Sequence, residues 1–181
     1  MRAFPIPFST RSAWRGAVLA IAAVVSGCTS TSYEVSRDDI VIDLGLGGFI
    51  NPIFERYNGF ASSGRRVVVD GHVISADAFA AFAMPNMCYT HNAIWSPHAI
   101  SQAGVVPDYA ATRYVASYLP EPLEEWFLAD HSSRDWIGVA MVRYDELVEI
   151  WPEGSCDPVE EGLAKFEAAQ AASPAAERIS R

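Results

Sequence analysis

Three segments of the chain carry residue types that can act together on a carbonyl group. The β-branched run Arg66–Asp70 leads to Ser75 at the start of an alanine-rich stretch, and a later apolar run ends at His98. Upstream, the run Asp39–Leu44 leads into the glycine-rich segment 45–48. A serine becomes a nucleophile when a neighbouring base accepts its proton, and glycine amides can hold a developing oxyanion. The set predicts a Ser–His site with a glycine oxyanion loop.

Each of these residues also has a purely structural interpretation. Serine is among the commonest helix N-caps, so the alternative role of the Ser75 hydroxyl is to bond the amides of the helix. His98 follows Pro97 and fits a packed core histidine, and Gly47-Gly48 fits a strand-to-helix turn. Gly48 and Ser75 are 27 residues apart and Ser75 and His98 are 23 apart, and these distances favour chemistry only through the family resemblance given below.

The elements around these residues predict an α/β domain. Asp39–Leu44 reads as a strand buried on both faces and Arg66–Asp70 as the next strand, joined by a helix that Asn51 caps and Pro52 opens. This spacing predicts a parallel strand–helix–strand unit, and Gly71 is expected to bend the chain. The later elements are expected as strands at 87–89 and 93–95, a loop at 101–107, a helix after an Asp108 cap, a helix at 123–130, a strand at 136–142 and a helix at 145–151.

The glycine pair, the serine at a helix start and the following histidine resemble the Clp-protease/crotonase superfamily. A closer resemblance is to small exported bacterial proteins with Ser-Ala-Cys and Phe-His-Ala sequences, which here read Ser75-Ala76-Asp77 and Pro97-His98-Ala99. The resemblance covers roughly residues 39 to 156. It implies repeated β-β-α units in a single domain, with a mostly parallel sheet and flanking helices.

The same resemblance assigns roles at the site. It makes Ser75 the nucleophile and His98 the base. It places Gly47 and Gly48 in the oxyanion loop, with the amides of Gly48 and Ala76 as donors. Asp77 departs from the pattern, and a negative charge there is expected to oppose an oxyanion. The acid that orients the base is Asp135 or Asp130, with Asp135 preferred.

The first 27 residues have the composition of an export signal. Arg2, Arg11 and Arg15 precede the apolar run 17–25, which is short for a membrane span. The ending Val25-Ser26-Gly27-Cys28 resembles a lipobox, which predicts lipid on Cys28; a plain signal peptide is the alternative. Residues 28–38 read as a polar tether, 39–157 as the domain, and 158–181 as a helical or frayed tail rich in Ala and Glu.

The chain has three cysteines, so a lipidated Cys28 leaves Cys88 and Cys156 as an even pair. In an oxidising compartment such a pair favours a disulfide, and two free thiols are the alternative.

Composition excludes several classes of function. A net charge of −9 argues against a nucleic-acid partner, which needs a basic face. The four histidines and the cysteines show no metal-ligand spacing, and no phosphate-binding glycine motif is present, so neither metal nor cofactor is expected.

The expected partner is the membrane of a bacterial cell envelope, on its periplasmic side, and the sequence leaves open assembly into homo-oligomers. The leading hypothesis is a lipid-anchored serine hydrolase or peptidase. Its rival is a non-catalytic envelope lipoprotein that uses the same fold for binding or assembly.

Overall fold

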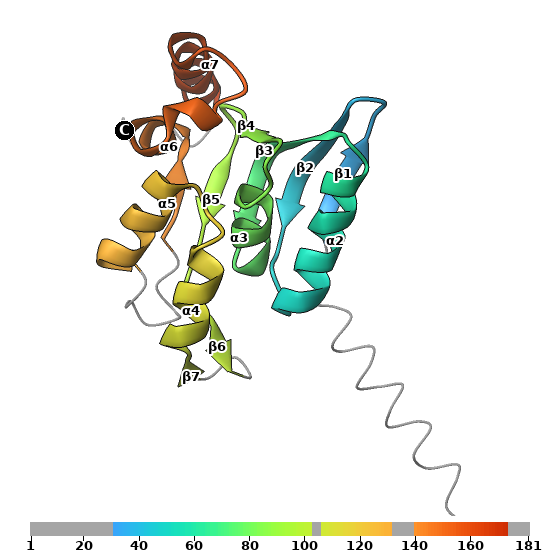
Figure 1. Cartoon of the computed structure of the whole chain (residues 1–181). Helices are drawn as coiled ribbons and strands as arrows, with labels where there is room; N and C mark the ends of the chain where they lie inside the picture. The colour runs from blue at the N-terminus through green and yellow to red at the C-terminus, as the bar shows by residue number, and fades with distance from the viewer. Residues whose placement is uncertain (1–30, 103–105, 132–139, 174–181) are drawn as a thin grey trace, which may run out of the picture.

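A computed structural model describes residues 31–102, 106–131 and 140–173. They form a single α/β domain built on one mixed sheet (Figure 1). The strands are β1 (Thr31–Val35), β2 (Asp39–Gly45), β3 (Arg66–Ile74), β4 (Met87–Tyr89), β5 (Ile94–Ser96), β6 (Ser101–Gln102), β7 (Val106–Pro107) and β8 (Val142–Arg143). The helices are α2 (Ile50–Ser62), α3 (Ala76–Phe82), α4 (Tyr109–Ala116), α5 (Glu121–Trp126), α6 (Tyr144–Ile150) and α7 (Val159–Ala172), with a π-helical turn at Phe127–His131 and a 3-10 turn at Pro152–Gly154.

The main sheet has the strand order β1-β2-β3-β5-β8, with β4 also pairing with β3. The centre is parallel, because β3 pairs in parallel with β2, β4 and β5. The edge strands β1 and β8 run antiparallel to their neighbours. The predicted α/β class is therefore confirmed, whereas the finer pattern of repeated β-β-α units stays a prediction.

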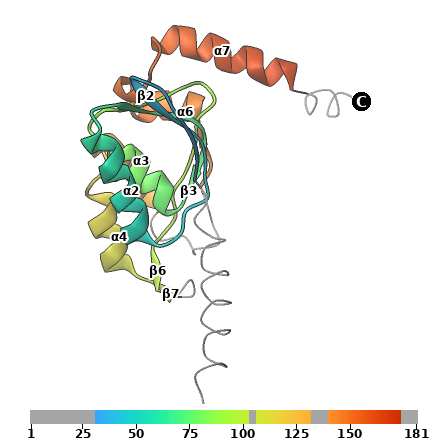
Figure 2. The same cartoon turned by 90° about the vertical axis from the view of Figure 1, so that its right-hand side faces the viewer.

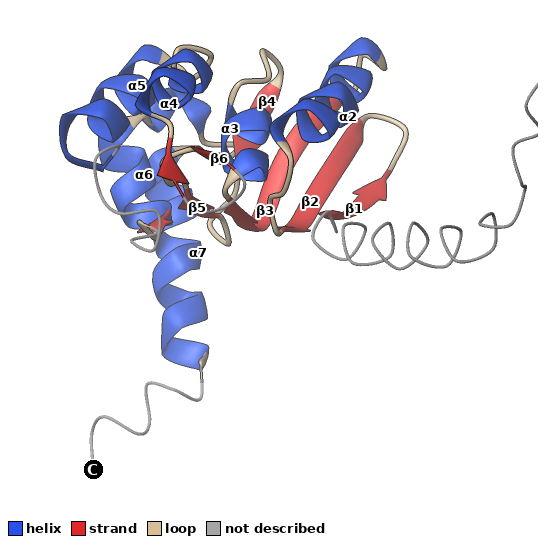
Figure 3. Cartoon of the chain, turned by 90° about the horizontal axis from the view of Figure 1, so that it is seen from below, coloured by secondary structure: helices blue, strands red, loops and turns tan. Residues whose placement is uncertain are grey.

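Helices α2, α3 and α4 lie together on one face of this sheet (Figures 2 and 3). The buried side of each strand faces them, with Ile40, Ile42, Val67 and Val69 at most 2% exposed. Among the described residues, no helix combines the length and apolar character needed to cross a membrane.

The start of α2 differs from the prediction that Asn51 caps it. The helix begins at Ile50 after Phe49, and no side chain caps its first turn. Pro52 fits within that turn because the first helical N–H groups have no intrahelical partner to lose. The buried residues of α2, Ile53 and Tyr57, are four apart and therefore lie on one face of the helix.

Strand β3 continues through the position where a bend was expected. Its register with β2 shifts between Ile42 and Leu44, so Asp70 and Gly71 form an irregularity rather than a turn. A Cβ at Gly71 would lie 1.8 Å from the Asp43 carbonyl oxygen, so only glycine allows this close approach. Val73 and Ile74 therefore extend the same strand and deliver Ser75 at its end.

The predicted polar tether at 28–38 is wrong for its central part, which forms β1. Thr31 pairs with Gly45 and Val35 with Ile40. Tyr33 packs edge-on against Phe60 of α2, with the ring centroids 5.0 Å apart. Pairing with β2 and this ring contact together hold the short polar strand, and composition reveals neither.

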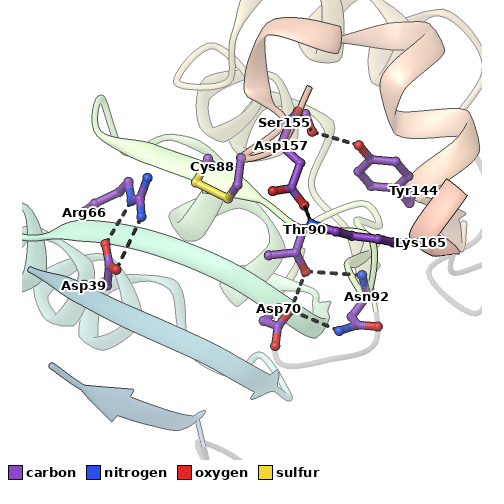
Figure 4. Close-up of a disulfide and its surroundings, with 11 residues drawn as sticks. Asp39, Arg66, Asp70, Cys88, Thr90, Asn92, Tyr144, Ser155, Asp157 and Lys165 are labelled. Atoms are coloured by element: carbon purple, nitrogen blue, oxygen red, sulfur yellow. Dashed lines mark hydrogen bonds and ion pairs between the residues drawn. A yellow bond between two sulfur atoms is a disulfide. The ribbon is translucent and has the colours of Figure 1, made fainter. Parts of the chain in front are cut away.

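A disulfide fastens the C-terminal part of the domain to the sheet (Figure 4). Cys88 of β4 is bonded to Cys156, with the two Cα atoms 5.0 Å apart. The Cys156 amide also donates to the Tyr89 carbonyl at 2.9 Å. Beyond it, the stretch predicted as a helix or frayed tail is helical over α7, and residues 174–181 lie outside the described part. Most of the strand expected at 136–142 also lies outside it.

Candidate active site

Ser75 occupies a strained turn between β3 and α3. Its φ of 59° and ψ of −126° make it the one non-glycine residue with positive φ in the described chain. Such conformations cost about 1–3 kcal/mol and cluster at functional sites. A serine held in a sharp strand-to-helix turn is the arrangement that exposes the nucleophile of many hydrolases.

Long-range contacts hold this turn in place. The Ser75 amide donates to the Ser96 carbonyl at 3.0 Å, and its carbonyl accepts from Phe79 at 3.4 Å. The interpretation of Ser75 as a helix cap fails, because its side chain accepts no hydrogen bond from α3. Within the described residues the Ser75 Oγ makes no hydrogen bond at all, which leaves the hydroxyl available.

Ser75 and His98 line the same cleft, which has a volume of about 470 Å³. The cleft lies where the parallel strands β2 and β3 end and the helices α2 and α3 begin. This is the edge at which open α/β sheets bind ligands. Its lining residues are Gly48, Phe49, Ile50, Asn51, Pro52, Ser75, Ala76, His98, Ile100 and Ser101.

The backbone fixes the tautomer of His98. Its Nδ1 lies 2.8 Å from the Ala99 carbonyl oxygen. A carbonyl can only accept, so Nδ1 carries the proton and Nε2 keeps its lone pair. Nε2 is therefore the ring nitrogen that can accept a proton, and the Ala99 carbonyl holds the ring through Nδ1.

The glycine loop packs directly on the serine. A Cβ at Gly47 would lie 2.4 Å from the Ser75 Cβ and 3.0 Å from its Oγ, and the φ of Gly47 is +75°. The Gly47 amide donates to Asp77 Oδ2 at 2.9 Å, so this amide is engaged and is not an oxyanion donor. The amides of Gly48 and Ala76 make no hydrogen bond within the described chain, and both residues line the cleft.

Asp77 has a different role from the one expected of it. It is fully buried and does not line the cleft. One carboxylate oxygen accepts from Gly47 and the other from the Thr31 hydroxyl at 3.0 Å. Arg56 donates to the same Thr31 oxygen. The carboxylate thus ties α3 to the glycine loop and to β1, and it fixes the loop against Ser75.

The Asp77 carboxylate also influences Tyr57, a fully buried residue of α2. Burial, followed by the charge of Asp77, raises the pKa of the Tyr57 hydroxyl well above its usual value. Tyr57 therefore stays neutral beneath the site.

Replacing Asp77 is expected to loosen the site and weaken the fold. Asp77→Ala leaves the Gly47 amide and the Thr31 hydroxyl without their acceptor, which costs roughly 2–4 kcal/mol of unfolding free energy. Asp77→Asn keeps one acceptor oxygen and should cost about half as much. Urea unfolding of the three proteins measures the difference. Equal midpoints for wild type and Asp77→Ala would show that the carboxylate does not hold the loop.

The remaining predicted site residues lie at the limits of the structure. Asp130 belongs to the turn Phe127–His131, but its side chain is outside the described part, as is all of Asp135. The orienting acid therefore stays a prediction. Cys28 also lies outside the described residues.

A second Ser–His pair lies behind the site and was not anticipated. His72 Nε2 is 2.7 Å from the Ser96 Oγ. Ser96 is fully buried, so no substrate can reach its hydroxyl. The pair joins β3 to β5 beside the carbonyl that holds the Ser75 amide. Only the parallel register of these strands brings the two residues together, so no sequence motif signals the pair.

His72 is expected to make stability depend on pH. Burial, and then the charge of Arg143, lower the pKa of His72. Below about pH 6.5 the unfolded chain therefore takes up a proton that the folded chain resists, and stability falls as pH decreases. His72→Gln should lose less stability than wild type between about pH 7 and about pH 5. Urea unfolding at both pH values tests this, and parallel losses would contradict it.

Within the described residues, no group of three or more His, Cys, Asp or Glu side chains is placed to hold a metal ion. The cleft presents Ser75, His98 and the backbone amides of Gly48 and Ala76. No protein-family model, no curated protein and no solved structure matches the chain.

Proposed function

We propose that this protein is a serine hydrolase of the cell envelope, acting by acyl transfer through Ser75 and His98. The observation that carries the proposal is the conformation of Ser75, whose backbone is strained and whose side chain does not cap α3. It shares one cleft with His98 and with the free amides of Gly48 and Ala76.

The proposed reaction uses these groups in turn. Ser75 Oγ attacks the carbonyl carbon of an ester or amide while His98 Nε2 accepts the hydroxyl proton. The carbonyl oxygen becomes an oxyanion that the Gly48 and Ala76 amides stabilise. His98 then gives its proton to the leaving group, and water hydrolyses the acyl-enzyme by the reverse proton path.

We extend the proposal to fold family and location. A parallel β2–α2–β3–α3 succession, with the cleft where the strands end, supports a Clp/crotonase-like arrangement. The sequence of residues 1–28 supports export and lipid attachment at Cys28, with the domain facing the periplasm.

One observation favours the rival function of a non-catalytic binding or assembly module. Ser75 and His98 are not hydrogen-bonded to each other in the described structure. In a catalytic site such hydrogen bonds are often long before substrate binds and tighten only in the complex.

Labelling with a fluorophosphonate probe separates them. The purified full chain in detergent should be labelled, and Ser75→Ala should abolish the label. His98→Ala should reduce the labelling rate by roughly 10²-fold or more, because the base is lost. A folded wild type that is not labelled would favour the binding module.

A further inference from the structure

Exposed apolar side chains lie in the lining of the cleft and in the segments beside it. Leu46 and Phe49 belong to the glycine loop and are 45% and 60% exposed, and Val106 of β7 is 61% exposed. We call these three residues the apolar rim. β7 pairs with β6, whose Ser101 lines the cleft. Large exposed apolar residues gathered around one opening are typical of an interaction surface.

The chain enters the domain at the same edge. β1 begins at Thr31, which pairs with Gly45 at the end of β2, immediately before Leu46. Figure 1 shows β2 pointing toward the end of the molecule where β6 and β7 lie. Cys28 precedes Thr31 by three residues, so an extended chain separates their Cα atoms by at most about 10 Å.

We infer that the apolar rim docks on the lipid bilayer into which the Cys28 lipid inserts, so that the cleft opens toward the membrane surface. This rests on the proposed lipid anchor. A tether this short holds the edge bearing the cleft at the bilayer, and apolar side chains at that distance insert at the headgroup boundary.

The rim itself is apolar, since Leu46, Phe49 and Val106 carry no charge. Three of the seven described basic residues, Arg37, Arg65 and Arg66, lie at the opposite edge, where β2 and β3 begin, whereas Arg56 donates to Thr31 at the edge where the chain enters. Salt screens charge contacts and not apolar ones, so docking through the rim should persist at high ionic strength.

A fluorescent probe at single positions tests the docking. With Cys28 lipidated and Cys88 bonded to Cys156, an introduced cysteine is the one free thiol. The full chain carrying Phe49→Cys or Val106→Cys is labelled with the environment-sensitive dye NBD. It is then reconstituted into vesicles of phosphatidylethanolamine and phosphatidylglycerol. Ser62→Cys is the control. Ser62 is exposed and ends α2, about 18 Å from the start of the helix, which Phe49 immediately precedes.

The inference predicts that emission from positions 49 and 106 shifts to shorter wavelength and is quenched by lipids with nitroxide-labelled acyl chains. Position 62 should show neither effect. Emission typical of water at positions 49 and 106 would overturn the inference. So would a shift to shorter wavelength without lipid quenching, which would indicate a second copy of the chain on the rim. Failure of the chain to float with the vesicles would contradict both the docking and the lipid anchor, and fluorophosphonate labelling of the same preparation tests the reactivity of Ser75 independently.

Discussion

Gly47→Ala is expected to abolish most of the reactivity of Ser75 while leaving the chain folded. The new methyl group would lie 2.4 Å from the Ser75 Cβ, in a backbone with a φ of +75°. The loop must move away, and the Gly48 amide moves with it. Loss of one oxyanion donor typically lowers the rate about 10²–10³-fold, and we expect a loss of that size in fluorophosphonate labelling.

Gly64→Ala is the matched control for this substitution. Gly64 has nearly the same φ, +73°, but among the described residues no atom lies within 4 Å of a Cβ built there. It should cost about 1 kcal/mol of stability from backbone strain alone and leave labelling unchanged. If both variants were labelled like the wild type, the glycine loop would have no part in the chemistry.

Removing the disulfide is expected to cause the largest loss of stability. The two cysteines are 68 residues apart in the chain. Closing a loop of that length reduces the entropy of the unfolded chain, and the chain-entropy model of disulfides predicts that this stabilises the folded state by about 4 kcal/mol. The double variant Cys88→Ala, Cys156→Ala should unfold at a clearly lower urea concentration than the wild type.

The disulfide does not line the cleft, so its removal should spare the site. Ser75 in the folded double variant should still be labelled at low temperature, and reduction of the wild type should give the same unfolding midpoint as the double variant. An unchanged midpoint would mean that other contacts, such as the bond from the Tyr89 hydroxyl to the Trp151 carbonyl, already hold this segment.

Much of the fold follows from local pattern. The β-branched runs became β2 and β3, and Asp108 caps α4 by accepting from Ala111 at 3.0 Å. These features depend on residues close in the chain, where propensity and capping act. β1 was missed because its order comes from pairing with β2 and from the contact of Tyr33 with Phe60.

The site follows the sequence less closely. Residue spacing was enough to suggest that Ser75, His98 and the glycine loop meet. It did not predict the backbone strain at Ser75, which depends on the Ser96 carbonyl and on close packing against Gly47. Nor did it predict the role of Asp77, because the hydrogen bond from Thr31 spans 46 residues.

A crystal structure of the protein after reaction with a small fluorophosphonate tests the central claim most directly. We expect phosphorus bonded to the Ser75 Oγ and the phosphonyl oxygen about 2.7–3.1 Å from the Gly48 and Ala76 amides. His98 Nε2 should face the Ser75 oxygen. A folded protein with no adduct at Ser75, or an adduct whose oxygen points away from both amides, would contradict the proposed active site.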